Sequence, residues 1–113
     1  YIRWCEQEDS KNGRPYSLRY VGSMVADIHR SLLKGGLFIY SKSKRAPNGK
    51  LRLMYECNPM AFIIEQAGGL ATNGEERTLD IAPKTIHQKS PILIGSADMV
   101  KLISKFIKSK QFN

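Results

Sequence analysis

Apolar residues recur at helical spacing in three stretches of the chain. The first covers residues 23–34, where Gly22 or Ser23 is placed to cap the helix and residues 35–36 are placed to stop it. The second starts with Asn58 at the cap and Pro59 in the first turn, and residues 68–69 end it. The third follows residues 95–96 and sets lysines 101, 105 and 108 opposite an apolar face. The spacing therefore predicts three amphipathic helices.

Short apolar runs between these helices predict strands. Residues 37–40 and 91–94 are bounded by turn residues, and residues 51–55 form a further apolar stretch. Residues 70–72 and 78–81 lie on either side of a turn at Asn73 and Gly74, so they are either a hairpin or two neighbouring strands. Because helices and strands alternate, the sequence predicts one α/β domain over residues 1–113, with a mixed β-sheet flanked by helices.

The composition is that of a folded chain. Of 113 residues, 42% are hydrophobic and 25% are charged, which argues against intrinsic disorder. No apolar run approaches the ~20 residues of a membrane-spanning helix, so we expect no membrane partner. Cys5 and Cys57 form no CxxC pattern, so we expect reduced thiols and a cytoplasmic protein rather than a disulfide framework or a zinc site. The sequence opens with Tyr1 and shows neither a signal peptide nor a transit peptide, so we expect a fragment.

Positive charge is concentrated in the middle of the chain, whose formal net charge is +8. Between Asp27 and Glu56 there is no acidic residue, and the basic ones are Arg30, Lys34, Lys42, Lys44, Arg45, Lys50 and Arg52. This window is either a solvated basic face or a site for a small anion that the charge attracts. A nucleic-acid surface is a third option, but no RNP-like, helix-turn-helix or zinc-finger pattern supports it.

Two further features have both a structural and a functional interpretation. Residues 19–24 (RYVGSM) gather a guanidinium, a phenol and a Gly-Ser helix start, which suit a phosphate or a sugar but also suit plain capping. Glu56 interrupts an apolar run just before a helix start. Its carboxylate either interacts favourably with the positive end of the helix dipole or is a ligand for Mg²⁺. His29 and His87 lack partners at catalytic or metal-binding spacing, so we interpret both as structural.

The chain also carries a set of specific segments: residues 19–27 (RYVGSMVAD), 49–62 (GKLRLMYECNPMAF), 65–69 (EQAGG), 79–81 (LDI), 86–88 (IHQ) and 94–96 (IGS). Together they resemble the C-terminal half of class I fructose-1,6-bisphosphatase. The likeness covers essentially the whole chain, and its most specific block is residues 50–60. One departure is Ser41, which stands where many relatives have proline.

The resemblance implies the C-terminal domain of the sugar-phosphatase fold and a role for each matching residue. Lys50 and Tyr40, with Tyr20 alongside, would hold the sugar and its 6-phosphate. Arg19 would reach into the 6-phosphate pocket of a neighbouring subunit. The remaining assignments are backbone groups around Gly22, Ser23 and Met24 at the furanose hydroxyls, Arg52 as the catalytic residue near the reacting phosphate, and Glu56 as a Mg²⁺ ligand.

The resemblance also implies an activity for the full-length enzyme. It would hydrolyse the 1-phosphate of fructose 1,6-bisphosphate to fructose 6-phosphate and phosphate in gluconeogenesis, as a homotetramer with Mg²⁺ or another divalent ion such as Mn²⁺. The family's other metal ligands belong to its N-terminal half, so we expect the isolated chain to be inactive. Sedoheptulose-1,7-bisphosphatase activity is an alternative within the same class. A non-catalytic basic module that binds nucleic acid is the alternative from another class, although we expect no nucleic-acid partner.

Overall fold

The computed structural model describes residues 1–19 and 21–111, and the side chains of residues 1–19 and 21–109. The helices are α1 (Ile2–Glu6), α2 (Met24–Lys34), α3 (Asn58–Gln66) and α4 (Ala97–Gln111). The strands are β1 (Leu37–Tyr40), β2 (Leu51–Arg52), β3 (Leu70–Thr72), β4 (Lys89–Ser90) and β5 (Ile92–Gly95). The short helical turns are η1 (Ser10–Asn12), η2 (Leu53–Cys57) and η3 (Thr78–Asp80).

The main sheet has the strand order β1-β5-β3, and both neighbours run antiparallel to β5. In the register, Ile94 lies between Phe38 of β1 and Ala71 of β3. Side chains alternate between the two faces of a strand, so Ile92 and Ile94 face one side of the sheet while Leu93 faces the other. All four residues of β5 are buried, because this central strand is covered on both faces.

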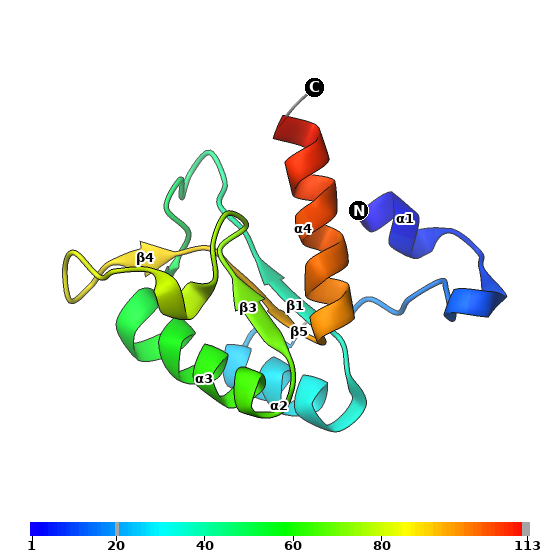
Figure 1. Cartoon of the computed structure of the whole chain (residues 1–113), viewed down its shortest axis with the longest axis horizontal. Helices are drawn as coiled ribbons and strands as arrows, with labels where there is room; N and C mark the ends of the chain where they lie inside the picture. Colours follow the sequence, from blue (N-terminus) through cyan, green and yellow to red (C-terminus); the bar gives the residue numbers. More distant parts are fainter. Residues whose placement is uncertain (20, 112–113) are drawn as a thin grey trace.

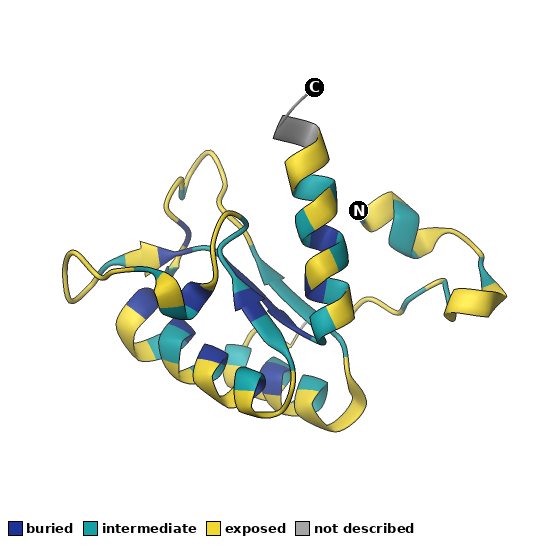
Figure 2. Ribbon diagram, in the orientation of Figure 1, coloured by how far each residue is buried: buried dark blue, intermediate teal, exposed yellow. Residues whose placement is uncertain are grey.

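Helices cover the two faces of this sheet (Figure 1). Helices α2 and α3 lie side by side on one face, where Ile92 and Ile94 join a buried cluster with Ile28, Ala61 and Ile64. Helix α4 lies on the opposite face and buries Val100 and Ile103. In Figure 2 the buried positions of the helices turn toward the sheet and the exposed ones turn outward. Helices thus flank a sheet in an α/β fold, as the alternation of elements predicts, but the expected mixed sheet is wrong, because all strand pairs of the described residues are antiparallel.

The segment before α2 packs on α4 through aromatic side chains. The ring of Phe106 lies 5.7 Å from that of Tyr1 and 6.2 Å from that of Trp4, measured between centroids. The Arg14 guanidinium lies 4.0 Å above the Trp4 ring, a cation–π contact. Residues 1–16 are thus held to the outer layer through α4.

Among the described residues, no helix is both long and apolar enough to cross a membrane.

Two details of the predicted elements are wrong. Residues 78–80 form the η3 turn rather than a strand, because Arg77 pairs with Asp80 at 2.8 Å and with Glu65 of α3 at 2.7 Å, which favours a tight turn against α3. Asn58 is the first residue of α3 rather than its cap, because the η2 turn continues directly into the helix with Cys57 in the cap position. The helix over residues 23–34 and the strands at 37–40, 70–72 and 91–94 are confirmed to within one residue at each end.

A second, two-stranded ribbon is attached to the main sheet. Strands β2 and β4 pair antiparallel, with Leu51 opposite Ser90 and Arg52 opposite Lys89. Only Pro91 separates β4 from β5, so one chain segment belongs first to the ribbon and then to the centre of the sheet. The side chain of Leu51 packs against the core beneath α2 and α3.

Gly49 fixes the loop that precedes the ribbon. Its φ is +80°, in the left-handed region that favours glycine. A Cβ atom on Gly49 would lie 2.6 Å from the backbone nitrogen of Pro91 and 2.6 Å from the carbonyl carbon of Ser90. The backbone of the loop therefore packs directly on the link between β4 and β5, an approach that a side chain at this position would prevent.

We expect Ile94→Ala to destabilise the fold by about 2–5 kcal/mol, because Ile94 is fully buried and its loss leaves a cavity. The matched control is Ile86→Ala, since Ile86 is 65% exposed and its substitution should cost within about 0.5 kcal/mol. Urea unfolding followed by circular dichroism measures both. Equal losses for the two variants would contradict the assignment of β5 as the central strand.

We expect Gly49→Ala to cost about 1–3 kcal/mol more than Gly68→Ala in the same assay. Both glycines have a positive φ, of +80° and +90°, so the backbone strain of the substitution is shared. Only at Gly49 does the added methyl group meet backbone atoms, whereas at Gly68 there is open space. Indistinguishable unfolding midpoints for the two variants would show that the loop does not pack on residues 90–91.

Candidate active site

The loop before β2 and the start of β4 line an open cationic cavity of about 430 Å³ at the surface. Arg45, Lys50 and Lys89 line it, together with residues 46–49, and no carboxylate belongs to the lining. The ion pairs in the described part of the chain join Asp9 to Arg14 and both Glu65 and Asp80 to Arg77, so none of them neutralises this cavity. Such an uncompensated cluster of cations attracts anions.

The loop itself is a compact turn. The amide of Ser43 donates to the carbonyl oxygen of Ala46 at 3.0 Å, and the amide of Ala46 donates back to Ser43 at 3.1 Å. The Gly49 amide then donates to the carbonyl oxygen of Ala46 at 3.0 Å. These bonds, with the close packing of Gly49 on residues 90–91, set the backbone of Lys50 beside β4.

The η2 turn that follows β2 is held by the segment at residues 87–90. The Leu53 amide donates to the Gln88 carbonyl oxygen at 2.7 Å. The Tyr55 hydroxyl lies 2.9 Å from Nδ1 of His87, so this histidine has a structural partner. Because η2 has the wide π-helical form, which is frequent at functional sites, its residues are placed differently from those of a regular helix.

Cys57 ends the same turn and is fully buried. Burial, and to a lesser extent the neighbouring Glu56 carboxylate, raises the pKa of the Cys57 thiol to about 12. A thiol with so high a pKa carries almost no thiolate at neutral pH and is a poor nucleophile. Its Sγ lies 3.9 Å from the Ser90 carbonyl oxygen, which adds a third link between η2 and the 87–90 segment. Cys57 is therefore a packing residue of the site, and both cysteines are free, as expected.

Glu56 points back to the strand it follows. Its Oε1 accepts a hydrogen bond from the Arg52 amide at 3.1 Å, so the carboxylate is oriented by β2. Two carboxylate oxygens offer about four acceptor positions, and one such bond leaves capacity for a hard cation. Among the described residues, no group of three His, Cys, Asp or Glu gathers to hold a metal ion. The donor set here fits one ligand of Mg²⁺ and not a complete cage.

Two other expected site residues share a hydrophobic base with the ribbon. Tyr40, at the end of β1, and Met24, at the start of α2, both pack against the core cluster that Leu51 also contacts. The ring of Tyr40 lies 6.3 Å from that of Phe38. Tyr40 does not line the cationic cavity, which Lys50 does.

The residues before α2 lie on an exposed stretch. Arg19, Gly22 and Ser23 are exposed, and Ser23 makes no side-chain capping bond to α2. Plain capping therefore does not account for its hydroxyl. Gly22 has a φ of +84°, which gives the turn into α2 its direction. Tyr20 lies outside the described residues.

The structure joins Arg52 to Glu56 through the hydrogen bond at 3.1 Å, and Lys50 precedes Arg52 by two residues, but neither Arg52 nor Glu56 lines the cavity that Lys50 lines. The structure also adds Lys89, which sequence reasoning missed. The basic window between residues 27 and 56 does not contain it, and its place opposite Arg52 is a product of strand pairing. A lysine next to a buried serine carries no local signal for such a role, so only the register between β2 and β4 identifies it.

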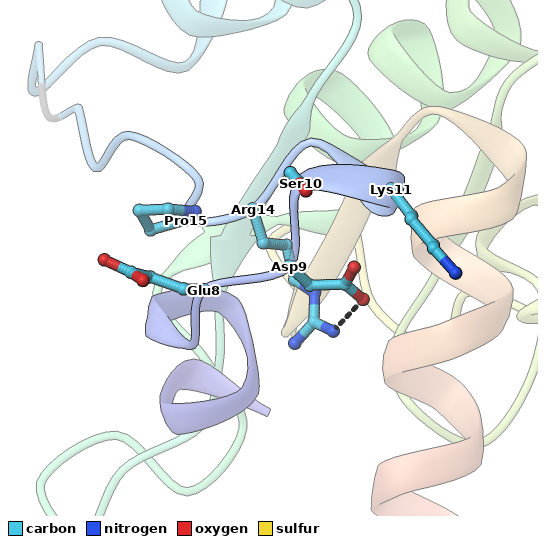
Figure 3. A pocket seen from close by; sticks show the side chains of 6 residues that line it. All are labelled: Glu8, Asp9, Ser10, Lys11, Arg14 and Pro15. Atoms are coloured by element: carbon cyan, nitrogen blue, oxygen red, sulfur yellow. Dashed lines mark hydrogen bonds and ion pairs between the residues drawn. The ribbon is translucent and has the colours of Figure 1, made fainter.

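A second cavity, of about 480 Å³, lies between η1 and the segment after α1 (Figure 3). Asp9 and Arg14 face each other there at 2.6 Å, while Glu8 and Lys11 point away from the pair. Hydrogen bonds from Asn12 and Arg14 lower the pKa of Asp9. Because its opposite charges already satisfy each other, this cavity is a weaker candidate for a charged ligand than the one beside Lys50.

The comparison with known protein families agrees with the resemblance seen in the sequence. The family model described as "Fructose-1-6-bisphosphatase, C-terminal domain" matches residues 1–108 of the 113. The match includes all of the ribbon, the η2 turn and the loop that carries Lys50. The α/β architecture is consistent with that domain. The chain belongs to the fructose-1,6-bisphosphatase family.

Proposed function

We propose that the protein carrying this chain hydrolyses the 1-phosphate of fructose 1,6-bisphosphate, giving fructose 6-phosphate and inorganic phosphate. The observation that carries the proposal is the cationic cavity lined by Lys50. Strand β2 follows Lys50 directly and ends at Arg52, whose amide donates a hydrogen bond to Glu56. A substrate with a phosphate at each end needs a binding site for one phosphate and a charged, metal-binding catalytic centre for the other. The family match supports this choice of substrate.

In this proposal Lys50 binds the 6-phosphate of the sugar. Its ammonium group is a compact point charge that suits phosphate oxygens. Tyr40 and Met24 pack against the core cluster that Leu51 also contacts, and the exposed residues Gly22 and Ser23 are available to the sugar hydroxyls. Arg19, which is exposed, serves the pocket of a neighbouring subunit in a homotetramer. Tyr20 completes the sugar site in the resemblance and lies outside the described residues.

Arg52 and Glu56 act at the reacting phosphate. The Arg52 guanidinium stabilises the negative charge that builds on the phosphate oxygens, and it can do so through two parallel hydrogen bonds. Glu56 offers a carboxylate oxygen to Mg²⁺, with its orientation fixed by the Arg52 amide. When bound, Mg²⁺ polarises the phosphate and favours attack by water. The remaining ligands come from phosphate, water and residues other than those described here.

We expect Glu56→Gln in the protein carrying this chain to lower kcat by about 10²-fold or more, since the carboxylate charge is lost. Glutamine keeps an oxygen that can accept the Arg52 amide, so the η2 turn should keep its shape. Phosphate release from fructose 1,6-bisphosphate measures the effect. Sedoheptulose 1,7-bisphosphate in the same assay shows whether the seven-carbon sugar is also a substrate.

The matched control is Glu65→Gln. Glu65 lies on α3, forms an ion pair with Arg77 and does not line the cationic cavity. Its substitution should change kcat by less than about twofold, because the ion pair that is lost involves no residue that lines the cavity. If Glu56→Gln retained more than half of the activity of the unsubstituted protein, Glu56 would not be a metal ligand in the reaction.

We expect the isolated 113-residue chain to release no measurable phosphate from fructose 1,6-bisphosphate in the presence of Mg²⁺. The reason is that the resemblance places the family's other metal ligands in its N-terminal half, and no group of three His, Cys, Asp or Glu among the described residues could hold a metal ion. The measurement is a colorimetric phosphate assay at high chain concentration, with the complete protein as the positive control. Robust turnover by the chain alone would contradict the proposal that its metal site is shared.

A further inference from the structure

We infer that Lys89 is a substrate-binding residue that holds a phosphate oxygen together with Lys50, an inference that rests on the proposed function. Nothing in the sequence pattern or in the resemblance gives Lys89 a role. The inference comes from the pairing of β2 with β4 and from the lining of the cavity.

The register of the ribbon creates a like-charge pair. Arg52 and Lys89 are directly opposite each other in the antiparallel pair. Like charges at opposed positions are destabilising, whereas opposite charges there are favourable. The cost of this pair would fall if either position were neutral or acidic, so stability alone does not account for a lysine at position 89.

The surroundings do not compensate for this charge. Lys89 and Lys50 line the same cavity, and Arg45 lines it as well. The ion pairs of the described part of the chain leave these side chains without a carboxylate partner. An anion bound between Lys50 and Lys89 would offset the repulsion of Lys89 by its positively charged neighbours. It would also accept charge-assisted hydrogen bonds from both ammonium groups. The cavity volume of about 430 Å³ leaves room for a phosphate group.

The backbone beneath these cations is set before any ligand binds. Gly49 packs on residues 90–91, and Leu51 pairs with Ser90, so the chain on either side of the cavity is fixed. Because this backbone is already ordered, anion binding has to order only the two lysine side chains, which favours affinity. The same backbone packing thus positions both Lys50 and Lys89.

The test compares Lys89→Gln with Lys84→Gln in the complete protein. Lys84 is exposed in the preceding loop and does not line the cavity, so its substitution removes the same charge from the same region. Inorganic phosphate is the first probe, and its effect on the melting temperature reports binding to the folded state. Steady-state kinetics with fructose 1,6-bisphosphate is the second.

We expect Lys89→Gln to reduce the phosphate-induced rise in melting temperature by at least about half and to raise KM about 5- to 20-fold, with kcat within about twofold. Without phosphate, its melting temperature should equal or exceed that of the unsubstituted protein, because the like-charge pair is gone. Lys84→Gln should match the unsubstituted protein in both assays.

Two results would overturn the inference. If both variants bind phosphate and substrate equally well, Lys89 is only a solvated surface residue. If Lys89→Gln loses the phosphate effect but keeps its KM, the cavity binds an anion that is not the substrate. A protein that binds phosphate through Lys89 but does not hydrolyse fructose 1,6-bisphosphate would instead refute the proposed function, and the phosphate assay would still decide whether Lys89 holds an anion.

Discussion

The packing of Gly49 on the link between Ser90 and Pro91 is the contact on which the site depends. The segment from residue 89 to residue 95 pairs with β2 at its start and forms the buried centre of the main sheet at its end. A loop that packs on this segment is therefore tied to the buried core of the fold. Because the contact is made by backbone atoms, it leaves the neighbouring Lys50 side chain available to the cavity.

This arrangement explains how so much positive charge can be held in one place. The apolar side of the ribbon is anchored by Leu51 and the buried Leu53, while the charged residues Lys50 and Arg52 alternate with them. Burial of the apolar positions stabilises the ribbon and offsets the repulsion between the cations. The site can thus keep an attraction for anions that a freely moving basic loop would lose.

The same alternation shows how far the sequence predicts the structure. Periodicity identifies the helices and the strands of the main sheet because each buries one face along a continuous stretch. It fails at residues 78–81, where the ion pairs of Arg77 reach back to Glu65, and at Asn58, where the π-helical turn moves the helix start. The first error has a cause outside the local window, whereas the second comes from a rare helical form that periodicity does not identify.

The residues of the candidate site also differ in whether the sequence or only the fold identifies them. The basic window and Glu56 are visible as unusual residues in the sequence, but their roles come from the family resemblance. Lys89 belongs to the cavity through strand pairing, which no local pattern reports. Tyr40 and Met24 both pack against the hydrophobic core cluster, so their placement follows from packing rather than from spacing.

The most direct test of the account is a crystal structure of the complete protein with fructose 6-phosphate and Mg²⁺. The account predicts the sugar phosphate within about 4 Å of the amino groups of Lys50 and Lys89, the range of an ion pair. It also predicts Mg²⁺ at about 2.0–2.1 Å from a carboxylate oxygen of Glu56. A sugar phosphate bound elsewhere, with the ribbon facing solvent, would contradict it.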